Sequence, residues 1–239
     1  MSKKMLSAIK RNACVFLLVL ASVSLVGCMS IQEAARMGNL GEIKKQLAWG
    51  VNPDEQAFWY KTAPLHEAAS NGHVDIVKLL LDKGADVNIR NEGGVTPLHY
   101  AAHHGHVRVM EVLLEYGADP AQKGTGCGTP MQWAARNGQI QAIKTLVDNG
   151  VSINQKGSGG VTALMDATSH GQVETVKFLL ANGADVNARD EKGSTALRTA
   201  SAWENVEIGR ILLQNGADPT IKTNDGGKVP QSFIDQLRK

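Results

Sequence analysis

Residues 96–117 read TPLHYAAHHGHVRVMEVLLEYG, and this stretch decides the fold. Thr96 can cap a helix whose first position is Pro97, where the missing N–H costs nothing. Gly105 ends that short helix, because a left-handed backbone is cheap only without a Cβ. A longer helix follows up to Gly117, and its apolar stripe lies at Val109, Val112 and Leu113. The stretch therefore predicts a pair of helices, the first short and the second longer.

The same phrase returns every 33 residues along the chain. Its successive copies begin at Ala63, Thr96, Thr129, Thr162 and Thr195. The glycines that stop the second helix keep the same interval, with Gly50 one residue out of register, and lie at Gly84, Gly117, Gly150, Gly183 and Gly216. One unit of this size cannot bury its own apolar face, so we expect the units to stack into a single elongated domain.

This pattern resembles the ankyrin repeat, whose Thr-Pro-Leu-His, Ala-Ala, Gly-His, Val-Leu-Leu and Gly-Ala-Asp-Val-Asn elements recur nearly verbatim over residues 63–89. The resemblance implies an all-α solenoid with a helix-turn-helix and a short hairpin in each repeat. Five clear repeats are expected within 62–227, at 62–94, 95–127, 128–160, 161–193 and 194–227. A degenerate repeat is expected within 28–61 and a C-terminal cap at 228–239.

Glu204 departs from the pattern, because it occupies the column that holds Gly72, Gly105, Gly138 and Gly171 in the preceding repeats. We expect a locally altered turn there, relieved by the neighbouring Asn205.

Residues 1–27 are predicted to form a secretory signal. Four Lys and Arg residues come first, and an uncharged, mostly apolar run follows at 13–27. That run is shorter than the roughly 20 residues of a spanning helix. It ends at Leu25-Val26-Gly27-Cys28, which resembles a lipobox whose cysteine is acylated. An ordinary secretory signal that contains a cysteine is the alternative.

The lipobox implies a bacterial lipoprotein held on a membrane by lipid at Cys28. The first repeat begins almost at this cysteine, so we expect the domain to lie close to the membrane surface. In proteobacterial sorting, Asp after the cysteine retains a lipoprotein at the inner membrane. The residue here is Met29, which implies that the protein is located at the periplasmic face of the outer membrane. The chain after residue 27 holds 21 Lys and Arg against 23 Asp and Glu. This balance gives no basic surplus for nucleic-acid binding.

Catalytic and metal motifs find little support in the repeats. The glycines of 124–128 lack the lysine of a phosphate-binding loop, and Cys127 among them has no activating partner in sequence. The stretch 167–171 superficially matches a lipase nucleophile elbow, but 68–72 is the same frame three repeats earlier and no strand precedes either. We therefore expect no enzyme and no cofactor.

Several histidines invite a metal interpretation. His103, His104 and His106 are close in sequence, but structural zinc prefers four ligands and His106 belongs to the ordinary Gly-His of the repeat. His66 and His99 belong to the Thr-Pro-Leu-His frame, where the resemblance implies a bond to backbone between repeats. We expect no metal site.

The short helices leave an exposed face, which is concave in ankyrin stacks. The column after the frame histidine holds Glu67, Tyr100, Trp133, Asp166 and Thr199, and helical spacing puts residues three and four places further on the same face. Tyr, Trp and Arg are enriched at binding hot spots. The candidate partner-binding residues are Tyr100, His103, His104, Trp133, Arg136, His170 and Trp203, together with Phe58, Trp59 and Tyr60 of the first hairpin. Packing on neighbouring repeats is the alternative for the large aromatic residues, and a hydrophobic lid over the first repeat is the alternative for the hairpin.

These observations favour a protein-binding module anchored in the cell envelope. Ankyrin-like lipoproteins of bacteria resemble immunity proteins encoded beside lipase toxins of type VI secretion systems, which implies a phospholipase effector as the partner. A periplasmic scaffold or enzyme-protecting factor is the alternative. The partner's identity is not encoded in a fold.

Overall fold

The computed structural model describes residues 29–58, 60–126 and 128–239. The predicted signal segment 1–27 lies outside the described residues, as do Cys28, Trp59 and Cys127. Residues 31–239 form one compact unit, and of the unit 1–30 only Met29 and Ser30 are described.

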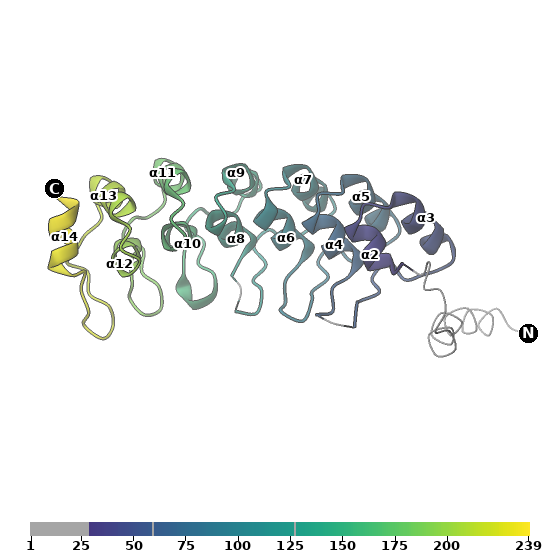
Figure 1. The fold of residues 1–239 in the computed structure, drawn as a ribbon, viewed down its shortest axis with the longest axis horizontal. Coiled ribbons are helices and arrows are strands. Elements are labelled where there is room, and N and C mark those ends of the chain that lie inside the picture. Colours follow the sequence, from purple (N-terminus) through teal and green to yellow (C-terminus); the bar gives the residue numbers. More distant parts are fainter. Residues whose placement is uncertain (1–28, 59, 127) are drawn as a thin grey trace, which may run out of the picture. The chain divides into compact units, whose positions relative to one another are not determined.

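Residues 31–239 fold into a stack of helix pairs joined by hairpins (Figure 1). In each pair a short inner helix is followed by an outer helix of nine residues. The inner helices are α2 (Ile31–Arg36), α4 (Pro64–Ser70), α6 (Pro97–His104), α8 (Pro130–Arg136), α10 (Ala163–Ser169) and α12 (Ala196–Ala202). The outer helices are α3 (Leu40–Ala48), α5 (Val74–Asp82), α7 (Val107–Glu115), α9 (Ile140–Asp148), α11 (Val173–Ala181) and α13 (Val206–Gln214). The last helix, α14 (Gln231–Leu237), packs on α13, and a 3₁₀ turn, η1 (Ser158–Gly160), lies in the hairpin before α10.

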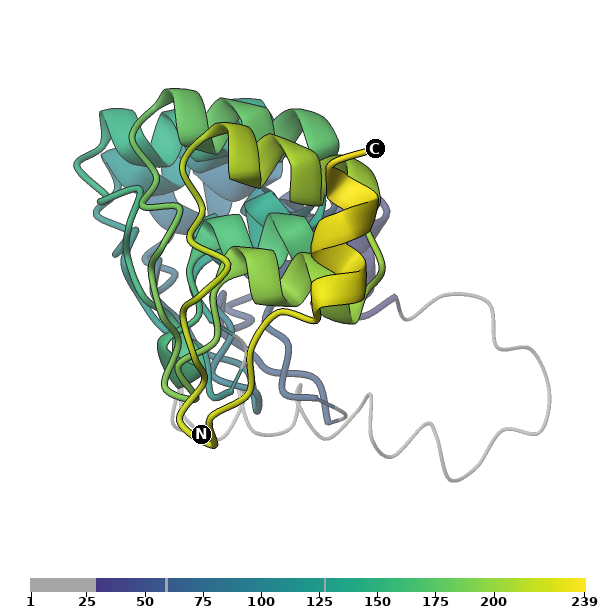
Figure 2. The same ribbon diagram turned by 90° about the vertical axis from the view of Figure 1, so that its left-hand side faces the viewer.

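The inner and outer helices form two parallel rows, and the hairpins extend from the side of the inner row (Figures 1 and 2). Neighbouring inner helices approach one another more closely than neighbouring outer helices do, so the stack bends toward the inner row. The exposed side of α4, α6, α8, α10 and α12, which we call the inner-helix surface, is therefore the concave one.

Small residues make the close approach of the inner helices feasible. Pairs of fully buried alanines face the neighbouring inner helix, at Ala68 and Ala69, Ala101 and Ala102, and Ala134 and Ala135. The outer helices contribute large buried side chains to the core, at Leu80, Leu113, Leu146, Leu179 and Leu212. Each such leucine stabilises the stack by roughly 1.5–3 kcal/mol through burial.

Each inner helix begins at a residue that the repeat frame supplies. Thr96 is the N-cap of α6, and its N–H donates to Nδ1 of the buried His99 over 3.2 Å. On the other side of the ring, Nε2 lies 3.3 Å from the Gly128 carbonyl oxygen of the next repeat. His66 bonds the Val95 carbonyl in the same way over 3.0 Å. These bonds join successive repeats, as the resemblance implied.

Glu204 keeps the turn of the pattern, so the expected alteration is wrong. Its φ of 52° is left-handed, like the φ of 69° at Gly171 one repeat earlier. Asn205 then caps α13, because its Oδ1 accepts from the Ile208 N–H over 3.0 Å. The glutamate adopts a backbone conformation that L residues rarely adopt, and the turn geometry is preserved.

The observed elements confirm the predicted all-α solenoid of helix pairs and hairpins. Within the described residues, β structure is limited to an isolated bridge between Gly124 and Gly128. In the same part of the chain no helix is both long enough and apolar enough to cross a membrane.

Candidate protein-binding surface

The structure brings four of the predicted binding residues together on α6 and α8. Tyr100 and Trp133 meet edge to face, with ring centroids 5.9 Å apart and planes at 80°. His103 lies 5.5 Å from Trp133 and 4.5 Å from His104, again edge to face. We call Tyr100, His103, His104 and Trp133 the central aromatic cluster. Edge-to-face packing is a favourable arrangement for aromatic pairs, so these rings hold one another in place.

Hydrogen bonds fix the cluster further. The Tyr100 hydroxyl accepts from Asn91 Nδ2 over 3.1 Å, and His103 Nδ1 accepts from Asn137 Nδ2 over 2.9 Å. Trp133 also packs edge to face on the buried His99, with centroids 5.6 Å apart. A partner that docks here meets side chains that are already ordered, which reduces the entropy cost of binding.

The cluster is electrically neutral at pH 7. Partial burial lowers the pKa of His103, and the neighbouring His104 and Arg136 charges lower it further. Partial burial and the neighbouring His106 lower the pKa of His104. The surface is therefore an aromatic patch rather than a cationic one, and it suits an apolar or aromatic group of a partner.

Arg136 is predicted to bind a partner, but it is committed to a neighbour. Its Nη2 lies 2.9 Å from Oδ1 of Asp166, while Oδ2 of that carboxylate accepts from Gln132 Nε2 over 2.8 Å. Asp166 is only 5% exposed, so the prediction that its column faces outward is wrong at this position. Arg136 keeps 40% of its side chain exposed beside the cluster and covers the buried carboxylate.

His170 and Trp203 follow the inner helices of the next two repeats. His170 is exposed, and its Nδ1 lies 2.8 Å from the Ser169 hydroxyl and 3.0 Å from the Asp166 carbonyl oxygen. Trp203 is 68% exposed and lines a hollow beside α12. These two residues extend the inner-helix surface toward the C-terminus without joining the central aromatic cluster.

The first hairpin presents two further aromatics to solvent. Phe58 is 86% exposed and Tyr60 is 77% exposed, so neither acts as a lid over the first repeat. Tyr60 and Lys61 both have positive φ, at 63° and 49°. Trp59, the third predicted residue of this hairpin, lies outside the described residues.

Sequence reasoning missed two features. Trp49 follows α3 with 67% exposure, and the Lys45 ammonium lies 4.7 Å from the centre of its ring. Arg198 takes the place of the frame histidine in repeat five, and its side chain lines the hollow beside Trp203. A signal for Arg198 was present, because a cation stands in a column that holds a buried histidine in the first two clear repeats.

The described residues also bear on the catalytic and metal motifs. Ser169 is the last residue of α10, and its hydroxyl donates to the Asp166 carbonyl, so 167–171 is a helix end rather than a nucleophile elbow. No group of three or more metal-ligating side chains gathers in the part of the chain that is described. Cys127 lies outside that part.

Comparisons with known proteins agree with this architecture. A family model described as "Ankyrin repeats (3 copies)" matches residues 31–124 and 132–223. The crystal structure of the human ASB11 ankyrin repeat domain is 31% identical with a TM-score of 0.76, and the match covers 86% of this chain and 96% of that one.

Similar curated proteins match over shorter stretches. The probable E3 ubiquitin-protein ligase XBOS33 of Oryza sativa subsp. japonica is 44% identical over 78 residues, which are 30% of this chain and 15% of that protein. The ankyrin repeat-containing protein P1E11.10 of Schizosaccharomyces pombe is 37% identical over 70 residues, 28% of this chain and 32% of that protein. This chain thus spans a third or less of both relatives. It belongs to the ankyrin-repeat family, whose stacked repeats are protein-binding scaffolds and typically non-catalytic.

Proposed function

We propose that this chain is a lipoprotein of the bacterial envelope that binds a protein partner through the inner-helix surface. The central aromatic cluster carries the proposal. Four aromatic rings from two adjacent repeats pack edge to face on the concave side of a rigid stack. Large aromatic side chains held in place at the centre of a surface are the residues on which protein interfaces most depend.

The location rests on the sequence before the repeats. Residues 13–27 form a short apolar run, Cys28 ends it in a lipobox-like tetrapeptide, and Met29 follows. Two or three acyl chains would hold such a protein stably on a membrane, whereas one chain binds only marginally. The proposed site is the periplasmic face of the outer membrane.

The proposed partner is a phospholipase effector that a type VI secretion system delivers. An immunity protein at this location would meet the toxin where it arrives and cover its active site or substrate entrance. A neutral aromatic patch fits this role, because the entrance of a lipase must itself be apolar to admit acyl chains. If the partner is instead an enzyme of periplasmic metabolism, the protein is a scaffold or protecting factor.

The anchor is tested by metabolic labelling with a fatty acid in cells that make the wild-type chain or Cys28→Ser. We expect label on the wild-type chain and none on the variant, because only a thiol at that position is acylated. Equal labelling of the two chains would show that Cys28 is not the anchor.

The immunity proposal requires that a lipase-like protein is encoded next to this one, and the interface is tested with that protein and residues 29–239. Trp133→Ala is expected to weaken the complex by about 2 kcal/mol, roughly 30-fold in the dissociation constant. Lys177→Ala on α11 is a matched outer-row control and should bind as wild type. Urea unfolding of the variant must remain cooperative for the comparison to hold.

The biological role is tested by exposing cells that lack this protein to siblings that deliver the lipase. We expect wild-type chain to protect them and the double variant Tyr100→Ala, Trp133→Ala to protect them poorly. Full protection by the double variant would move the interface to the Phe58 and Tyr60 hairpin.

A further inference from the structure

The repeats are joined by a frame side chain that reaches the next repeat. His66, His99 and Gln132 occupy one column, and each contacts a backbone carbonyl of the following repeat within 3.0–3.3 Å. All three side chains are buried. The column continues with Met165 and then with Arg198. Arg198 therefore occupies the column in which earlier repeats have a buried side chain that hydrogen-bonds to the next repeat.

Arg198 does not make the corresponding hydrogen bond. It is half-buried, and its guanidinium forms no hydrogen bond or ion pair with any residue that the structure describes. The segment after α13 is a hairpin and α14, and α14 packs on the outer helix α13. The five N–H donors of the guanidinium are thus available to a ligand.

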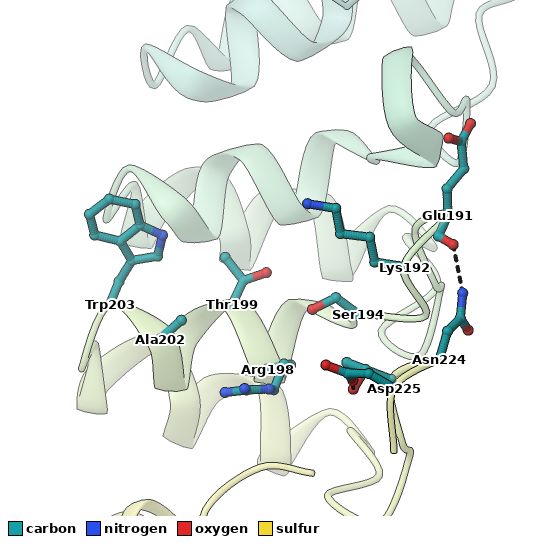
Figure 3. Close-up of a pocket in the computed structure, with 10 residues that line it drawn as sticks. Glu191, Lys192, Ser194, Arg198, Thr199, Ala202, Trp203, Asn224 and Asp225 are labelled. Carbon is teal, nitrogen blue, oxygen red and sulfur yellow. Dashed lines mark hydrogen bonds between the residues drawn. The ribbon is translucent and has the colours of Figure 1, made fainter. Parts of the chain in front are cut away.

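A hollow of about 520 Å³ lies beside Arg198, between α12 and the hairpins on either side of it (Figure 3). Its floor is formed by small side chains, Thr199 and Ala202, in columns that hold Trp133 and Arg136 two repeats earlier. Figure 3 shows Trp203 as one wall, with Lys192 extending from the hairpin toward Thr199. We call this hollow, defined by Lys192, Arg198, Thr199, Ala202 and Trp203, the C-terminal pocket.

The charges that line the C-terminal pocket favour an anion with a single negative charge. Lys192 and Arg198 are the cations, and Asp225 and Glu191 also line the hollow. The Asp225 carboxylate accepts from the Thr223 hydroxyl and from the Gly227 N–H; these bonds, and more weakly the Arg198 charge, lower its pKa. Glu191 lies at the edge of the hollow with its carboxylate directed away from Trp203 (Figure 3). Because the Glu191 carboxylate is directed away, two cations face one carboxylate in the hollow, and this balance suits one added negative charge.

We propose that the C-terminal pocket receives the carboxylate side chain of a glutamate or aspartate from the protein partner. The Arg198 guanidinium donates a forked pair of hydrogen bonds to the carboxylate, and the Lys192 ammonium adds a second cation. The indole of Trp203 packs against the methylene groups that carry the carboxylate. The identity of the occupant as part of a protein rests on the proposed function, whereas recognition of a carboxylate is a property of the pocket itself.

The test uses two acetylated, amidated tetrapeptides, Gly-Leu-Glu-Gly and Gly-Leu-Gln-Gly, which differ in one charge. Residues 29–239 are labelled with ¹⁵N, since residues 31–239 form a compact unit with its own core. We expect millimolar Glu peptide to shift the Trp203 indole and Arg198 side-chain signals, and the Gln peptide to bind about tenfold more weakly.

Variants separate the pocket from general attraction. Arg198→Gln should abolish the preference for Glu over Gln, and Lys192→Gln on the exposed hairpin should reduce it without touching the helix. Lys78→Gln, an exposed cation on the outer helix α5, is the matched control and should keep the full preference. Inorganic phosphate is titrated in parallel.

Equal binding of the two peptides, or a preference that survives Arg198→Gln, would overturn the proposal. Stronger shifts with phosphate than with the Glu peptide would overturn it in favour of a phosphate site. Because neither peptide contacts the central aromatic cluster by design, a failure here is distinguishable from a failure of Trp133→Ala to weaken the protein complex.

Discussion

Repeat two and repeat five share one sequence frame but differ in what the frame residue does. In repeat two His99 is fully buried, bonds the next repeat and is covered by Trp133. In repeat five Arg198 is half-buried, leaves the next segment unbonded and lies in an open hollow. The comparison teaches that the same column joins two repeats where it holds a buried histidine. Where the column holds Arg198, the side chain remains available to a ligand.

The largest expected effect is acid sensitivity of the first two clear repeats, which hold the frame histidines. Burial lowers the pKa of His66 and of His99 from 6.5 to about 4. The unfolded chain binds protons below about pH 6.5, whereas the native imidazoles resist them until about pH 4. The contribution of these two histidines to the free energy of unfolding is therefore fully present above about pH 6.5, and it is lost as the pH falls toward 4. Between pH 7 and pH 5 we expect a loss of roughly 2 kcal/mol for each histidine, measured by urea unfolding.

Repeat three supplies the control for this titration. Gln132 stands in the same column, accepts from the Thr129 N–H over 3.0 Å and donates to the Val161 carbonyl over 3.2 Å. The double variant His66→Gln, His99→Gln can make the same bonds and does not titrate, so most of the acid loss should disappear. Arg198→Gln should leave the pH dependence as it was. An unchanged pH slope in the double histidine variant would contradict the assignment.

A smaller difference is expected at pH 7 between truncation of the frame residue in repeat two and truncation of the frame residue in repeat five. His99→Ala leaves the Thr96 N–H and the Gly128 carbonyl unpaired and opens a cavity, so the free energy of unfolding should fall by about 2–3 kcal/mol. Arg198→Ala removes a side chain without hydrogen bonds and should cost under about 0.5 kcal/mol. Chemical denaturation of both variants decides, and equal losses would mean that Arg198 also joins repeats.

The sequence predicts the frame because each frame residue has a local physical task. Thr96, Pro97 and Gly105 start and stop a helix through backbone effects, and these effects do not depend on distant residues. The interval of 33 residues then extends that local prediction to the whole stack. The all-α solenoid was predictable for this reason.

The site was predictable only in part, because exposure depends on which neighbours arrive from other repeats. The columns correctly grouped Tyr100 with Trp133, but they could not show that Arg136 reaches across to bury Asp166. The pocket around Arg198 is formed jointly by α12 and two hairpins, which no single column reveals. Burial and pairing between repeats are properties of the packed structure.

Glycine positions test how strongly a following repeat constrains a turn. A Cβ at Gly72 would lie 2.9 Å from Nδ1 of His106 in the next repeat, whereas a Cβ at Gly150 would meet no atom within 4 Å. Both residues have positive φ. Gly150→Ala should therefore cost about 1 kcal/mol for the backbone alone, and Gly72→Ala about 1 kcal/mol more for the contact. Thermal or urea unfolding measures the difference, and equal costs would show that His106 moves aside freely.

The smallest expected effect is a gain in stability rather than a loss, and it concerns repeat five. Glu204 holds a φ of 52° in the column that is glycine in the four preceding repeats, and this conformation costs an L residue about 1 kcal/mol. Glu204→Gly relieves that strain, but it also makes the unfolded chain more flexible, so the net gain should be about 0.5 kcal/mol. Glu207→Gly, an exposed position inside α13, is the matched control and should lose about 1 kcal/mol. A loss of stability in Glu204→Gly would mean that the glutamate side chain contributes more than its backbone conformation costs. Repeat five would then be stabilised by a side-chain contact that the repeat frame does not supply.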